Sequence, residues 1–152
     1  MVHRVEAVIP RPMRREEEPA VRALYAQGHP FWPPRSDCWY VAYPTLVVEQ
    51  DGAIVGFTSF SLGTITGLCM LHGQDLVVDL SVRGAGFGTI LHRARLEIGR
   101  DAGATMFSGF TQGDNASMQR IFLAAGHHAC QTVRRYYPDG GDAVLYLGPV
   151  RD

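Results

Sequence analysis

The 152-residue sequence contains no lysine, only one asparagine and only three cysteines. Without lysine, the chain cannot contain the Gly-Lys-Ser/Thr loop with which many nucleotide-binding proteins hold phosphate. The cysteines, Cys38, Cys69 and Cys130, lack the spacing of a metal site, so we expect reduced, buried thiols and no bound metal. No stretch approaches the about 20 apolar residues of a membrane span, and the N-terminal segment has no signal-type apolar region. We therefore predict a cytoplasmic protein with no membrane partner.

Charged residues are also sparse, at 19% of the chain, and the formal net charge is −1. This balance provides no strong positive field, so we predict no nucleic-acid partner. All 14 basic residues are arginine, which we attribute to genomic base composition rather than to phosphate recognition. With 46% hydrophobic residues, a chain of this length buries one ordinary core, and we expect a single domain over residues 1–152.

The most informative stretch is a glycine-rich segment between a strand pattern and a helix pattern. Leu76, Val77 and Val78 form a β-prone run, residues 83–88 supply three glycines, and a helical pattern begins near Thr89. Glycines let backbone amides approach a ligand, and the unpaired N–H groups of a first helical turn favour an anion. The spacing does not fit the dinucleotide fingerprint G-x-G-x-x-G. The segment therefore predicts a phosphate-bearing ligand of another class.

The rest of the chain alternates strand and helix patterns. In chain order we predict a strand over 5–12, a helix starting near Glu16, a hairpin turning at Asp51-Gly52, a turn within 63–67, a strand over about 68–79, the helix after the glycine segment, a strand over 105–111, a helix over about 115–125, and strands over 129–137 and 143–147. The helix after the glycine segment should bury Phe87, Leu91, Ala94 and Ile98. His127 and His128 follow a helix stop, so we expect both at the surface.

A second motif follows the strand over 105–111. Asn115 can cap a helix with Met118, Ile121 and Phe122 in its apolar stripe, and Gly126 ends the helix.

These two motifs resemble signatures of the GNAT superfamily of acyl-CoA N-acyltransferases. Arg83-x-x-Gly86-x-Gly88 is similar to the pyrophosphate-binding phrase R/Q-x-x-G-x-G/A, and the later motif is similar to N-x-x-A-x-x-L-Y-x-x-x-G-F. With the matching element order, the resemblance covers essentially the whole chain. It implies a mixed α/β fold, the GNAT fold, with a central, mostly antiparallel sheet of about six to seven strands flanked by helices.

The resemblance also implies acetyl-CoA as the cofactor and an N-acetyltransferase that moves the acetyl group to a primary amine. Backbone groups of a splayed strand would pair with the cofactor and polarise its thioester carbonyl. The implied cofactor contacts are Leu76, Val77, Val78, Asp79, Leu80, Arg83, Gly84, Ala85, Gly86, Phe87, Gly88, Asn115 and Phe122.

Phe122 is the main departure from the family pattern, because that position is usually a tyrosine that donates a proton to the leaving thiolate. Phenylalanine has no proton to donate. Three alternatives follow. The thiolate leaves unassisted or through water, another hydroxyl such as Tyr136 or Tyr137 substitutes, or the protein binds acyl-CoA without turnover.

Candidate bases lie on the strand before the glycine segment, since the attacking amine must lose a proton. Histidine titrates near neutrality, so His72 is one candidate, and Asp75 is the other. Each has a simpler alternative, His72 as a half-buried structural residue and Asp75 as a group that only binds the substrate amine. Alternation places His72 and Gln74 on one face and Asp75 and Asp79 on the other, unless the strand carries a bulge.

The stretch from Gly28 to Tyr40 contains three prolines and four aromatic residues, which predicts a shaped loop. In the family, the segment after the first helix commonly helps to form the acceptor pocket. Trp32, Trp39 and Tyr40 would wall that pocket, with Gln74 as a further substrate contact, or the rings would cap the core. We predict a small-molecule amine acceptor, with a protein or peptide amine and a non-catalytic acyl-CoA-binding module as alternatives. The family also makes a homodimer possible.

Overall fold

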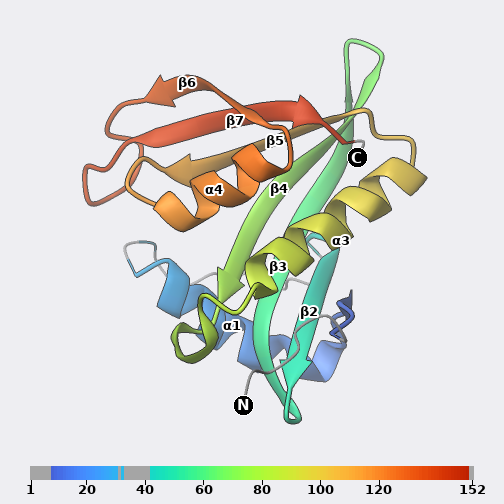
Figure 1. Cartoon of the computed structure of the whole chain (residues 1–152), viewed down its shortest axis with the longest axis vertical. Coiled ribbons are helices and arrows are strands. Elements are labelled where there is room, and N and C mark those ends of the chain that lie inside the picture. Colours follow the sequence, from blue (N-terminus) through green and yellow to red (C-terminus); the bar gives the residue numbers. More distant parts are fainter. Residues whose placement is uncertain (1–7, 31, 33–41, 151–152) are drawn as a thin grey trace.

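A seven-stranded mixed sheet forms the centre of the structure, a computed structural model that describes residues 8–30, 32 and 42–150 (Figure 1). Its strand order is β1-β2-β3-β4-β5-β7-β6, antiparallel except for the parallel pair β4 and β5. The strands are β1 (Arg11–Pro12), β2 (Thr45–Gln50), β3 (Ala53–Ile65), β4 (Leu68–Val78), β5 (Met106–Gln112), β6 (His128–Val133) and β7 (Ala143–Pro149). The helices are α1 (Glu18–Gly28), α3 (Phe87–Asp101) and α4 (Ala116–Ala124), with short 3-10 turns η2 (Arg15–Glu17) and η3 (Leu80–Val82). The predicted mixed α/β fold and its element order are confirmed.

Helices cover both faces of the sheet, as Figure 1 shows. On one face, Val21 and Leu24 of α1 pack against Phe57 of β3. On the other, Leu91 of α3 packs against Val48 of β2, and α4 lies beside α3 over the second half of the sheet. Because successive strand residues point to opposite faces, β2 supplies Val47 to one core and Val48 to the other.

Both hairpin turns in the first half of the sheet are two residues long. Asp51 and Gly52 have φ values of 52° and 80°, as the predicted turn requires. The next turn is Thr66-Gly67, with φ values of 50° and 81°, and β3 continues to the residue before it. The predicted turn from Gly63 to Gly67 was therefore too long, because β3 continues through Gly63 to Ile65.

Two predicted strands differ in extent. The predicted strand over 5–12 lies partly outside the described residues, and in the described part only Arg11 and Pro12 pair with β2. The prediction of a strand over 129–137 was wrong at its end, because β6 stops at Val133 and Arg135 has a φ of 53°. Tyr136 and Tyr137 therefore lie in the β6–β7 loop.

The buried face of α3 also differs from the prediction. Phe87 and Leu91 are buried as expected, but Ile98 is 38% exposed, and His92 and Arg95 are buried instead. Apolar periodicity missed this face because its polar residues bond to one another inside the core.

Two further predictions were wrong, one that His127 is exposed and one that Cys130 is buried. His127 is fully buried, because its ring stacks on Phe107 with centroids 4.5 Å apart, whereas His128 is exposed as predicted. Cys130 is exposed, because it lies on the edge strand β6, and Cys69 is half-buried. Cys38 lies outside the described residues.

Candidate active site

A bulge in β4 brings the two candidate bases to one face of the sheet. On β4, His72 pairs with Ser61 of β3, and Asp75 pairs with Ser59. His72 and Asp75 are three residues apart on β4, whereas their partners Ser61 and Ser59 are only two apart on β3, so Gln74 is the extra residue. Because Ser59 and Ser61 share a face, His72 and Asp75 do too. Simple alternation was wrong for Asp75, and the bulge is the reason.

Strands β4 and β5 pair only at one end. Their register runs from Met70–Met106 to Gly73–Gly109, and beyond that point the two strands diverge (Figure 1). The N–H of Asp79 bonds to Val55 of β3 at 2.8 Å, so by alternation the backbone groups of Leu76 and Val78 point away from β3. These groups therefore face the side on which β4 and β5 separate, called the opening below, where an extended ligand can pair with them.

The glycine-rich segment forms the start of α3. Gly84 and Gly86 have φ values of 84° and 95°, and a Cβ at either position would meet no atom within 4 Å. The first bond within α3 runs from Ile90 N–H to the Gly86 carbonyl, so the N–H groups of residues 87–89 have no acceptor within the helix. Together with the helix dipole, these donors suit a phosphate group.

Other predicted cofactor residues have structural partners of their own. Arg83 donates from Nε to the Val78 carbonyl at 3.1 Å, and Asn115 accepts from the Met118 N–H at 3.1 Å as the helix cap. Asp79 accepts from the Ser81 N–H at 3.1 Å. Leu80 is 61% exposed, whereas the rings of Phe87 and Phe122 are buried. Phe122 packs against Phe107 and Tyr146, and its role in cofactor binding stays a prediction.

Asp75 has a neighbour that sequence reasoning missed. Its carboxylate accepts from the Ser59 hydroxyl at 2.9 Å and lies 3.3 Å from His29 Nε2 at the end of α1. Burial lowers the pKa of His29, and the negative charge of Asp75 opposes that shift. A histidine just after a helix gave no signal in the sequence, because only the folded chain places it opposite β4.

His72 lies within a row of polar groups on the same face. Its Nδ1 is 2.8 Å from the Ser108 hydroxyl on β5, and Gln74 donates from Nε2 to the Ser61 hydroxyl at 3.1 Å. Burial, and then the positive charge of Arg95, lower the pKa of His72. His72 is therefore neutral at neutral pH and able to accept a proton.

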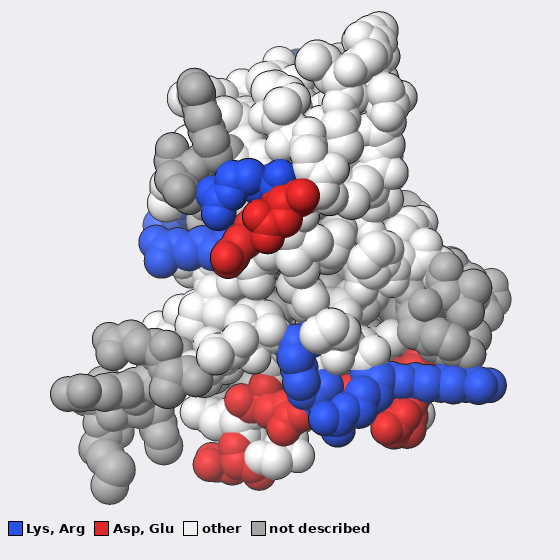
Figure 2. Space-filling view, turned by 90° about the vertical axis from the view of Figure 1, so that its right-hand side faces the viewer, with Lys and Arg blue, Asp and Glu red and all other residues white. Residues whose placement is uncertain are grey.

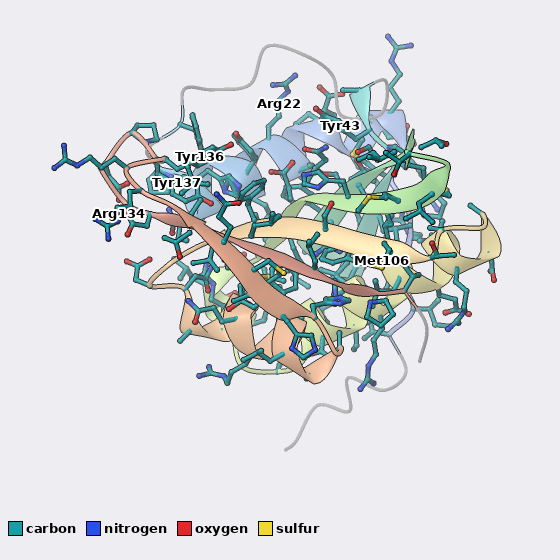
Figure 3. All side chains as sticks on the ribbon, turned by 90° about the horizontal axis from the view of Figure 1, so that it is seen from above. Arg22, Tyr43, Met106, Arg134, Tyr136 and Tyr137 are labelled. Carbon is teal, nitrogen blue, oxygen red and sulfur yellow. The ribbon has the colours of Figure 1, made fainter. Side chains whose placement is uncertain are left out.

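Four aromatic rings from three segments form a series of contacts that begins at His72. Phe110 of β5 lies edge-on to His72 at 6.3 Å and stacks on Tyr136 at 5.7 Å. Trp32, after α1, lies 6.5 Å from Tyr136 and 6.1 Å from Tyr137. In Figure 3 the loop that carries both tyrosines lies beside α1. Trp39 and Tyr40, the other predicted wall residues, lie outside the described residues.

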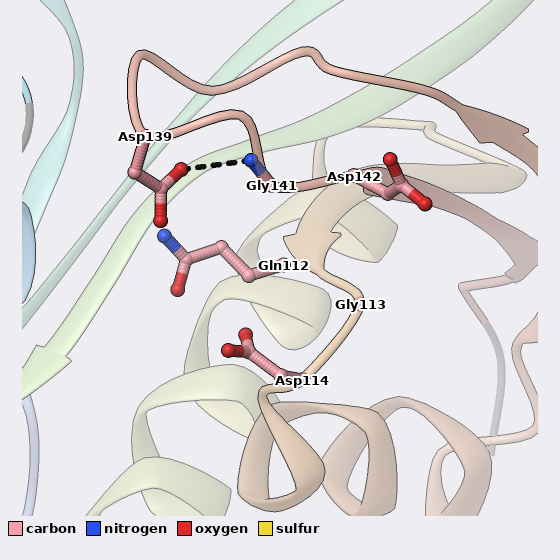
Figure 4. A pocket seen from close by; sticks show the side chains of 6 residues that line it. All are labelled: Gln112, Gly113, Asp114, Asp139, Gly141 and Asp142. Atoms are coloured by element: carbon pink, nitrogen blue, oxygen red, sulfur yellow. Dashed lines mark hydrogen bonds between the residues drawn. The ribbon is translucent and has the colours of Figure 1, made fainter.

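A pocket of about 290 Å³ opens next to the same loop (Figure 4). Its walls come from the β5–α4 turn, with Gln112 and Asp114, and from the β6–β7 loop, with Asp139 and Asp142. Asp139 accepts from the Gly141 N–H at 2.9 Å, the bond drawn in Figure 4. Because three carboxylates line it, the pocket favours a cation.

The surface adds two findings on partners. On the face in Figure 2, positive and negative side chains are interspersed on a largely uncharged surface. Within the described part of the chain, no helix is long and apolar enough to span a membrane, and no group of three His, Cys, Asp or Glu residues is placed to hold a metal.

Comparisons with known proteins agree with this fold. The sequence model of the acetyltransferase (GNAT) family matches residues 12–127. An uncharacterized N-acetyltransferase of Methanocaldococcus jannaschii is 28% identical over 118 residues, which are 77% of this chain and 69% of that protein. A chain of the NatC complex bound to Gag peptide and CoA has a TM-score of 0.79 at 15% identity, covering 93% of this chain and 98% of that one. A Salmonella typhimurium protein whose structure was solved with its cofactor acetyl-CoA has a TM-score of 0.79 at 17% identity over 95% of both chains.

Proposed function

Because the chain belongs to the acetyltransferase (GNAT) family, we propose that it transfers an acetyl group from acetyl-CoA to the primary amine of a small molecule with an aromatic or apolar group. The family gives the reaction and the cofactor. The acceptor is our proposal, and the observation that carries it is the cluster of Trp32, Phe110, Tyr136 and Tyr137 that begins at His72. Three of these rings, those of Trp32, Phe110 and Tyr136, are exposed, and exposed rings that lie together are typical of a binding surface.

The residues around the opening fit acetyl-CoA. We infer that the N–H groups of residues 87–89 hold its phosphates, with Gly84 and Gly86 leaving room, and that Leu76 and Val78 pair with its extended arm. When bound, acetyl-CoA supplies the thioester from which the acetyl group is transferred. The Leu76 N–H faces the opening and is the donor best placed for the thioester carbonyl oxygen.

The polar row supplies the groups that handle the amine. We infer that neutral His72 takes the amine proton, and that the carboxylate of Asp75, held by Ser59 and His29, attracts the amine before it is deprotonated. The acidic pocket next to the β6–β7 loop adds a field that favours cationic amines. Phe122 supplies no proton, and burial raises the pKa of Tyr137 to about 12, which makes that phenol a weaker acid. We infer that the thiolate leaves through water, and Tyr136 stays the alternative proton donor.

The acceptor is tested by measuring CoA release with a panel of amines. We expect phenylalkylamines to have a KM at least about tenfold below that of short polar amines and short peptides, because burying one ring contributes roughly 1.5–3 kcal/mol. Phe110→Ala should remove most of this preference and leave the KM for acetyl-CoA unchanged. Leu123→Ala, which trims a 56% exposed side chain on α4, is the matched control. A panel in which peptides react best would contradict the small-molecule acceptor.

The base is tested by the pH dependence of kcat/KM. Because the pKa of His72 is lowered, the profile should contain an inflection below the ordinary histidine value of about 6.5, apart from the rise caused by the amine itself. His72→Gln should remove that inflection, whereas His128→Gln, an exposed histidine, should keep it. An inflection that persists in His72→Gln would show that His72 is not the base, and Asp75 with His29 would then be the candidate base.

A further inference from the structure

Arg95 on α3 is a buried cation on the face of β4 opposite His72. Its side chain is 2% exposed, and its Cζ lies 5.2 Å from the centre of the Phe107 ring. A Cβ on Gly73 would lie 2.7 Å from Arg95 Nη1, so only glycine lets the guanidinium approach the strand so closely. Burying a cation is costly unless its N–H groups find acceptors, so the partners of Arg95 show what the arrangement achieves.

Those partners lead to one carbonyl in the bulge. Arg95 Nη1 donates to Thr58 Oγ1 at 2.9 Å, and the Thr58 hydroxyl donates to the Asp75 carbonyl oxygen at 2.7 Å. Nη1 is also 3.4 Å from the same carbonyl. A hydroxyl that accepts from a cation is a stronger donor, because bonds in a chain polarise one another. The Asp75 carbonyl is therefore held and polarised from the buried side.

The same peptide bond carries the Leu76 N–H. Within the described residues the peptide bonds are trans, so the carbonyl of Asp75 and the N–H of Leu76 point in opposite directions. The carbonyl turns toward β3 and Thr58, and the N–H consequently turns toward the opening between β4 and β5. A tilt of this peptide would move the N–H away from the opening and tilt the Asp75 side chain as well.

We propose that Arg95, acting through the Thr58 hydroxyl, is a positioning residue that orients and polarises the Asp75–Leu76 peptide so that the Leu76 N–H stabilises negative charge on the thioester oxygen. No proton is transferred along this path. The inference rests on the proposed function, because it assumes that the thioester occupies the opening. It extends that function by assigning a role in the reaction to two residues that do not touch the substrate.

The test replaces Thr58, which leaves the cation in place. Thr58→Val keeps the shape but removes the hydroxyl, and Thr58→Ser keeps the hydroxyl and serves as the matched control. We expect Thr58→Val to lower kcat about tenfold, less than the 10²–10³ typical for loss of an oxyanion donor, with the KM for acetyl-CoA nearly unchanged. Thr58→Ser should stay within about twofold of the original kcat. If Thr58→Val does not fold, Thr58→Cys, a weaker donor of similar size, takes its place.

A second readout separates positioning from mere stability. The amide proton resonance of Leu76 in the free protein should move upfield in Thr58→Val, because its peptide is less polarised, and should be restored in Thr58→Ser. A lower melting temperature with unchanged kcat and an unchanged Leu76 resonance would overturn the proposal. If the unaltered protein neither binds acetyl-CoA nor acetylates any amine, the proposed function fails. The Leu76 resonance is a separate test: if it does not move in Thr58→Val, Thr58 does not polarise the Asp75–Leu76 peptide.

Discussion

Aspartate in place of Gly86 is expected to weaken acetyl-CoA binding about 100-fold or more. Gly86 precedes α3, and the N–H groups of residues 87–89 have no acceptor within the helix. A carboxylate there would compete for these donors and repel the phosphates. Two unit charges about 4 Å apart near a protein surface interact by roughly 4 kcal/mol, and each 1.4 kcal/mol is about tenfold in affinity.

The control is aspartate in place of Gly67. Gly67 and Gly86 have φ values of 81° and 95°, and a Cβ on either would meet no atom within 4 Å. Gly67→Asp therefore introduces the same charge and similar backbone strain, but in the β3–β4 turn. Titration calorimetry with acetyl-CoA should give wild-type affinity for Gly67→Asp. Equal, undiminished affinity in Gly86→Asp would show that the phosphates do not bind at the start of α3.

Local sequence signals predicted the elements of the fold that depend on neighbouring residues. Asp51-Gly52 predicted its hairpin because a two-residue turn needs left-handed backbone at both positions, and Asn115 predicted its helix because its side chain caps the N–H group three residues on. The glycines at positions 84 and 86 predicted an open turn before α3 for the same reason. Each of these signals is complete within a few residues.

Contacts between distant segments could not be predicted from these signals. The ring of Trp32 meets Tyr136 and Tyr137 across more than half of the chain, and His29 meets Asp75 only because α1 crosses the face of β4. The bulge at Gln74 depends on the register with β3, so the sequence could state it only as a condition. The assignments of His72 and Asp75 to catalysis stay predictions, although the bulge places both on one face.

The buried polar groups of α3 were the least predictable part, because each is stabilised by a partner far along the chain. Arg95 Nε donates to His92 Nδ1 at 2.9 Å, so the proton of His92 is on Nε2, which lies 3.0 Å from His127 Nε2. His127 must then accept through Nε2 and carry its own proton on Nδ1. Protonating either histidine ring would break this series of hydrogen bonds and place a second cation beside Arg95.

The hydrogen bonds that join Arg95, His92 and His127 predict a steep loss of stability in mild acid. Burial, and then the charge of Arg95, lower the pKa of His92 far below its ordinary value and that of His127 to about 4. The unfolded chain, with histidine pKa values of about 6.5, binds protons that the folded chain does not, so stability is complete above that pH and falls as pH drops toward 4. Each of these two histidines contributes up to about 1.4 kcal/mol per pH unit, so together they should lower the free energy of unfolding by up to about 2.7 kcal/mol per unit between about pH 6 and pH 5.

Adjacent histidines in the chain provide the matched test. Urea unfolding between about pH 7 and pH 5 should show that His127→Asn is less stable at neutral pH but has a slope smaller by about 1.4 kcal/mol per pH unit. His128→Asn alters an exposed residue and should keep the original slope. A slope that is unchanged in His127→Asn would mean that the acid sensitivity arises elsewhere. The neutral tautomers inferred for His92 and His127 would then be wrong, and with them the direction of the hydrogen-bond chain from Arg95.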